Sequence, residues 1–186
     1  MFTAFALLLG CTGLRAISHP EALYTSFGVA APKVDQEIIE RWKADRELLI
    51  RNASTPDTVI KTSSGRKTTV AELAGTKVAA VTAVEVLVDS VPEGIELERG
   101  SARVTANSGY EVLGHFSMHY PAKRPLSEAL DDVKVLTNAA NGNLAIITWQ
   151  RSEQKTVHGV VGLVFKRDAR TKVNRETLRS GKVSDI

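Results

Sequence analysis

Two histidines four positions apart have the residue type and spacing that come closest to a chemical motif in this chain. The stretch His115-Phe116-Ser117-Met118-His119 lies in a predicted β-strand. Because side chains alternate across a sheet, His115, Ser117 and His119 should project from one face. The opposite face should carry the larger side chains Val112, Phe116, Met118 and Tyr120. Two imidazoles on one face can share a metal ion, or one can act as a general base near Ser117.

A metal ion on this strand would need a third ligand. Glu111, expected on the same face, and the more distant His158 are the candidates. A half-buried strand with solvated histidines on its polar face explains the same pattern without any chemistry, and we favour that interpretation. We therefore predict no metal and no cofactor. His115, Ser117 and His119 remain the candidates for a small metal-dependent or histidine-based enzyme.

Common catalytic and nucleotide-binding motifs are absent from the sequence. It contains no Gly-x-Ser-x-Gly turn, no phosphate-binding glycine loop ending in Lys-Ser or Lys-Thr, no Gly-x-Gly-x-x-Gly turn and no His-Glu-x-x-His helix. The single cysteine, Cys11, excludes an intrachain disulfide and a cysteine-rich zinc cluster. The adjacent carboxylates Asp131 and Asp132 should diverge on any regular element, so we expect them on a solvated face.

Positive charge is concentrated near the C-terminal end of the sequence, although the formal net charge is only +3. The candidate anion-binding residues are Lys166, Arg167, Arg170, Lys172, Arg175, Arg179 and Lys182. Such a cluster attracts phosphates or anionic lipid headgroups. No aromatic residue follows Phe165, which argues against base stacking on single-stranded nucleic acid. The alternative interpretation is a solvated basic tail that keeps the protein soluble.

Hydrophobic periodicity predicts helices mainly in the first half of the chain. The most regular helical pattern spans residues 32 to 52, where Trp42 lies on the apolar face. A short helix is predicted after His19-Pro20, through Tyr24, and a brief one is predicted from a cap at Thr68 or Thr69 to Gly75. One or two helical turns are predicted within residues 126 to 136.

Strands are predicted over most of the remaining chain. Their expected ranges are 58 to 62, 77 to 91, 95 to 99, 102 to 106, 110 to 120, 145 to 150 and 156 to 166. The second of these also fits a helical stripe, but its β-branched content favours a strand. Trp42 and Trp149 are both expected in the core. The predicted fold class is α+β, mainly β: an antiparallel sheet or sandwich of six to seven strands with N-terminal helices.

The first fourteen residues carry no charged side chain and are mostly apolar. As a helix they would reach only about 21 Å, short of the ~30 Å hydrocarbon core of a bilayer. A secretory signal is one interpretation, and Leu8-Leu9-Gly10-Cys11 resembles a bacterial lipoprotein processing site. No Lys or Arg precedes the apolar run, which argues against both. We favour a segment that docks on a partner or associates with a membrane surface through residues 1 to 17.

These observations predict one domain with two flanking segments: an apolar extension (1–31), an α+β domain (32–165) and a basic tail (166–186). No resemblance to a family is specific enough to name. We predict a non-catalytic structural or accessory subunit of a larger assembly, membrane-associated or part of a virion, with protein partners and an oligomeric state. The alternatives are a nucleic-acid or anionic-surface binder acting through residues 166 to 182, and the small enzyme described above.

Overall fold

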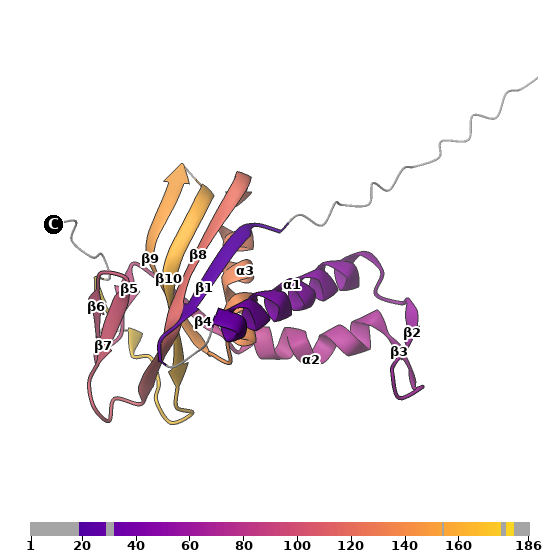
Figure 1. Ribbon diagram of the computed structural model, residues 1–186, viewed down its shortest axis with the longest axis horizontal. Helices are drawn as coiled ribbons and strands as arrows, with labels where there is room; N and C mark the ends of the chain where they lie inside the picture. Colours follow the sequence, from indigo (N-terminus) through magenta and orange to yellow (C-terminus); the bar gives the residue numbers. More distant parts are fainter. Residues whose placement is uncertain (1–18, 29–31, 154, 176–177, 181–186) are drawn as a thin grey trace, which may run out of the picture.

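A five-stranded mixed sheet with three helices on one face forms the centre of the part of the chain that the structure describes (Figure 1). The computed structural model describes residues 19–28, 32–153, 155–175 and 178–180. The fold class is α+β with a high strand content, as the sequence predicts. The predicted apolar segment 1 to 17 and Lys182 lie outside the described residues. No helix among those residues is long and apolar enough to cross a membrane.

The central sheet has the strand order β1-β8-β10-β9-β4. Its strands are β1 (Glu21–Ser26), β8 (Tyr110–Pro125), β10 (Thr156–Arg167), β9 (Leu144–Glu153) and β4 (Glu85–Val88). The first four pair antiparallel, in agreement with the predicted antiparallel sheet. β4 pairs parallel to β9, which makes the sheet mixed.

The three helices pack together on one face of the sheet. They are α1 (Pro32–Ser54), α2 (Val70–Thr82) and α3 (Leu126–Ala139). Trp42 of α1 is fully buried, as predicted, and packs in one cluster with Phe116 and Met118 of β8. Phe116 approaches β10 at Gly162, where a Cβ would lie 2.8 Å from the ring and 2.3 Å from the Ile146 carbonyl oxygen. This cluster is the main core.

Smaller strands cover one end of the opposite face of the sheet (Figure 1). They are β5 (Ser90–Val91), β6 (Ile95–Glu98), β7 (Ser101–Val104) and β11 (Arg179–Ser180). Residues of β5, β6 and β7 form a second buried cluster with Leu163 and Phe165 of β10, and β11 pairs with β5. A separate hairpin of β2 (Val59–Lys61) and β3 (Lys67–Thr69) precedes α2. These small strands therefore leave the other end of this face of the sheet uncovered.

Two predicted elements are wrong and one is too short. The helix expected through Tyr24 is β1, in which burial alternates between Tyr24 and the exposed neighbours Leu23 and Thr25. The strand expected over residues 77 to 91 is a helix up to Thr82, because α2 continues past Gly75 and buries Val70, Ala74 and Val81 on one side. The short turns expected after residue 126 form the complete helix α3.

Candidate functional site

The predicted histidine face lies on β8, in the interior of the sheet. His115 and His119 project on the face opposite the helices, while Phe116 and Met118 are buried under the helices. His115 is partly buried and His119 is exposed. Burial lowers the pKa of His115 below its ordinary value of 6.5. The two imidazoles therefore share a face, and their chemical role stays a prediction.

A β-bulge alters the predicted surroundings of these histidines. Consecutive residues Val164 and Phe165 of β10 pair with Gly114 and Val112 of β8, which leaves Leu113 as an extra residue. Val112 consequently packs in the second cluster, on the histidine face, and not on the opposite face as predicted. By the same alternation Glu111 lies on the other face from His115. Among the described residues no group of three or more potential ligands could hold a metal ion.

Beside the histidines, an apolar row crosses the uncovered end of the sheet. Leu23 of β1 pairs with Ser117, Ser117 with Val161 of β10, and Val161 with Trp149 of β9. Directly paired residues share a face, so the four side chains form one cross-strand row. Leu23 is 74% exposed and Trp149 is 52% exposed. The prediction that Trp149 lies in the core is therefore wrong, because the small strands do not reach this end of the sheet.

A second row, next to the first, combines opposite charges with a glycine. It consists of Glu21, His119, Gly159 and Arg151, again paired strand by strand. Glu21 and Arg151 are exposed and lie at its two ends. Gly159 lies beneath the Trp149 ring, which a Cβ there would meet at 3.8 Å. We call these two rows, eight residues in all, the open sheet face.

The basic segment is partly used within the fold. Arg167 donates to Glu85 at 2.7 Å, and the Arg175 guanidinium lies 3.8 Å from the same carboxylate. Lys166 donates to the Asn141 carbonyl at 3.1 Å, and Arg179 donates to the Ile95 carbonyl at 3.0 Å. The side chains of Arg170 and Lys172 are exposed. Anion binding by this segment stays a prediction, and four of its cations also hold the chain against the sheet.

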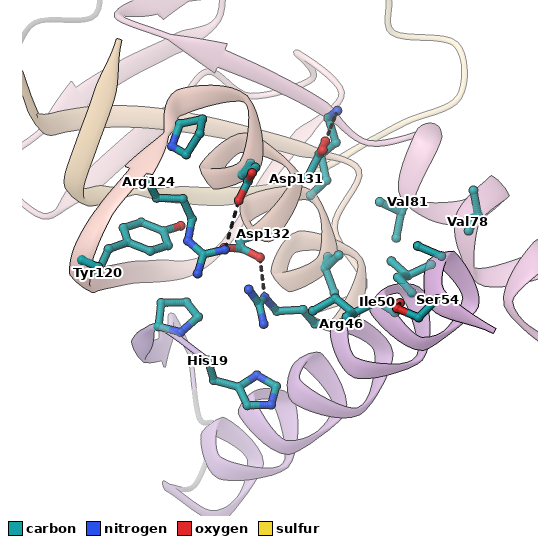
Figure 2. Close-up of a pocket in the computed structure, with 18 of the residues that line it drawn as sticks. His19, Arg46, Ile50, Ser54, Val78, Val81, Tyr120, Arg124, Asp131 and Asp132 are labelled. Carbon is teal, nitrogen blue, oxygen red and sulfur yellow. Dashed lines mark hydrogen bonds and ion pairs between the residues drawn. The ribbon is translucent and has the colours of Figure 1, made fainter. Parts of the chain in front are cut away.

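A cavity of about 840 Å³ lies where the helices meet the end of β8 (Figure 2). One part of its wall is apolar and comes from the three helices: Leu49 and Ile50 of α1, Val78 and Val81 of α2, and Val135 of α3. The other part is polar: His19, Arg46, Tyr120, Arg124, Glu128 and Asp132. Its volume falls within the range of ordinary small-molecule sites.

A buried ion pair forms the polar end of this cavity (Figure 2). Arg46 Nε donates to Asp132 Oδ1 at 2.5 Å, and both side chains are buried. The Trp42 indole Nε1 donates to the Asp132 backbone carbonyl at 3.1 Å, which fixes α3 against α1. Burial raises the pKa of Asp132, and the Arg46 charge opposes that shift. Burial, reinforced by the Asp132 charge, also raises the pKa of Tyr120.

Sequence reasoning missed this cavity. Asp132 was expected on a solvated face, but it is only 5% exposed, because α3 turns it toward α1. Its partner Arg46 lies 86 residues away in the chain, so no local spacing indicates the pair. The one local signal is that Arg46 follows Trp42 by four residues, on the same side of α1.

Comparison with known proteins gives no relative from which a function could be inferred. No family model, no curated protein and no solved structure matches this chain. The function therefore has to be argued from the open sheet face, the basic segment and the cavity.

Proposed function

We propose that the protein is a non-catalytic accessory subunit that acts by association, and that the open sheet face is its attachment surface. The supporting observation is the apolar row, in which Leu23 and Trp149 remain largely exposed at the two ends of the row. Aromatic and aliphatic side chains grouped on a surface and rimmed by polar residues are typical of protein interfaces. Trp149 is of the residue type most often found at the energetic centre of such surfaces.

The occupant that best fits this surface is a second copy of the same chain. A two-fold axis parallel to the strands would place β1 of one copy over β9 of the other, and β8 over β10. Leu23 would then face Trp149 of the second copy, and Glu21 would face Arg151 of the second copy. His119 would lie over Gly159 and the Trp149 ring of the second copy. The open sheet face is thus complementary to itself in charge and in the apolar contact between Leu23 and Trp149.

The apolar segment 1 to 17 is the second attachment point in this proposal. It lies outside the described residues, and the argument for it is its composition alone. In the assembled state it would bind a partner protein or a membrane surface, while the open sheet face joins the copies. The proposed location is accordingly within an assembly or at a membrane.

Sedimentation velocity of the purified full chain, with native mass measurement, tests the proposal. We expect a dimer that dissociates on dilution. Trp149→Ser should shift the population to monomer at the same concentration, because it removes the largest apolar side chain of the row. The control is Val59→Ser, on the β2–β3 hairpin, where an exposed apolar side chain (64% exposed) is replaced away from the open sheet face.

A monomer at every concentration would overturn the second copy as occupant. If Val59→Ser weakened the dimer as much as Trp149→Ser does, the open sheet face would not be the interface. Turnover of a substrate that depends on His115 and His119 would overturn the non-catalytic assignment and restore the histidine enzyme.

A further inference from the structure

The cavity between the helices has an apolar wall made of aliphatic side chains. Ile50 from α1 faces Val78 and Val81 from α2 across it (Figure 2), and Leu49 of α1 also lines the cavity. Val78 is 40% exposed although it is a β-branched aliphatic residue on a helix. Filling this space with an apolar group would remove the wall from water, which is favourable because the hydrophobic effect grows with the apolar area buried.

One carboxylate at the polar end of the cavity is incompletely hydrogen-bonded. Asp132 Oδ1 accepts from Arg46, whereas Oδ2 is buried and accepts no hydrogen bond of standard geometry among the described residues. The neighbouring Tyr120 hydroxyl, 3.6 Å from Met118 Sδ, also interacts with the Asp132 carboxylate. His19 Nδ1, on the same lining, is also buried without a partner in the described structure. Buried polar atoms are nearly always satisfied, so these two point to a ligand with a hydrogen-bonding head.

Ion pairs hold most of the charged side chains around the cavity. Besides the Arg46–Asp132 pair, Arg124 lies 3.3 Å from Glu128, and Lys134 lies 2.9 Å from Asp131. Lys123, which also lines the cavity, is exposed. A charged head would leave an extra charge beside the buried pair, and an uncompensated buried charge is strongly unfavourable. A neutral head avoids this cost.

We propose that this cavity binds a neutral amphiphile, with its hydrocarbon chain between α1 and α2 and its hydroxyl head donating to Asp132 Oδ2. The same hydroxyl oxygen can accept a hydrogen bond from the polar side chains around it. This inference is independent of the association through the open sheet face, which lies on the opposite side of the sheet.

Trp42 provides a reporter for binding at this site. Its ring lies 6.1 Å from that of His19, and its Nε1 donates to the Asp132 carbonyl beneath the cavity. The chain has two tryptophans, so a Trp149→Phe background leaves Trp42 as the sole indole. Tryptophan emission then reports the cavity alone.

The experiment compares three eight-carbon probes on the full chain in that background: octan-1-ol, octanoate and octylammonium. We expect octan-1-ol to change Trp42 emission saturably, with the two charged probes at least tenfold weaker. Val78→Phe should abolish the response by filling the apolar wall. Val34→Phe on α1 should leave it unchanged, since Val34 has nearly the same exposure (41%) and does not line the cavity. Asp132→Asn should weaken octan-1-ol binding relative to the charged probes.

Two results would overturn the proposal. The proposal fails if octan-1-ol gives no saturable response, or if it gives one that Val78→Phe does not remove. It also fails on equal or tighter binding of octanoate or octylammonium, which would show that the head is not selected for neutrality. Because Val78→Phe and Val34→Phe leave the buried ion pair intact, the test does not depend on the folding of the Asp132 variant.

Discussion

Asp132 is held in the protein interior by its ion pair with Arg46 and by the surrounding fold. Removing a carboxylate from water costs several kcal/mol, and Arg46 offsets that cost only while it stays in place. The raised pKa of Asp132 agrees with this, because burial outweighs the favourable charge of Arg46. At the residue scale, the pair is therefore a strong determinant of how α1 and α3 fit together.

Arg46→Met should lower the free energy of unfolding by about 3–5 kcal/mol, because it leaves the buried carboxylate unpaired. The double variant Arg46→Met with Asp132→Leu should lose much less, since no buried charge remains. Urea unfolding monitored by circular dichroism measures both. Lys43→Met is the control, because Lys43 pairs with Glu40 on the exposed side of α1. A double variant as unstable as Arg46→Met would contradict the account.

His115 should make the protein less stable at mildly acidic pH. Burial lowers its pKa in the folded state, so the unfolded chain binds the proton first as the pH falls below about 6.5. The free energy of unfolding should fall in that window, and His115→Gln should remove part of the fall. Urea midpoints at about pH 7.5 and pH 5.5 measure it. Ser117→Ala, a change on the same face without a titratable group, should keep the slope of the parent.

At the scale of elements, α2 shows how a local signal fixes one end of a helix. Thr69 accepts from the Glu72 backbone N–H at 3.1 Å, and the Glu72 side chain accepts from the Thr69 backbone N–H. This reciprocal pair satisfies two donors that the first turn would otherwise leave open. The predicted cap at Thr68 or Thr69 is confirmed at Thr69.

Thr69→Ala should therefore destabilise the protein by about 1 kcal/mol through the loss of the cap. The same substitution at the exposed residue Thr76, inside α2, should stabilise or leave the protein unchanged, because alanine has the higher helix propensity. Thermal unfolding of the two variants makes the comparison. An equal loss in both would show that the capping box is not what holds this end of α2.

The strands could be predicted where turns mark their ends, as in β6, β7, β9 and β10. Burial alternates in β6 and β7, whereas β9 and β10 contain runs of consecutive buried residues. The end of α2 could not be predicted from the sequence, because the run from Val78 to Val84 contains β-branched residues that suit a strand as well as a helix. Packing against α1 and α3 decides in favour of the helix. The bulge at Leu113 also has no local signal, and it moves Val112 and Glu111 to the faces opposite those predicted.

At the scale of the whole molecule, the sheet is covered unequally. The helices cover one face, and β5, β6, β7 and β11 cover only one end of the other (Figure 1). The sequence could place the histidines on one face, since alternation is local. It could not predict that Trp149 is exposed or that Arg46 meets Asp132, since both depend on which elements lie beside one another.

The most direct test of the central claim is a charge reversal across the proposed two-fold axis. In that arrangement Glu21 of each copy faces Arg151 of the other, so Glu21→Arg and Arg151→Glu should each weaken the dimer by bringing like charges together. The double variant restores opposite charges and should recover the dimer. Sedimentation velocity at matched concentration and low salt measures the three dissociation constants. Recovery in the double variant is the result we predict, and losses that simply add would contradict association through the open sheet face.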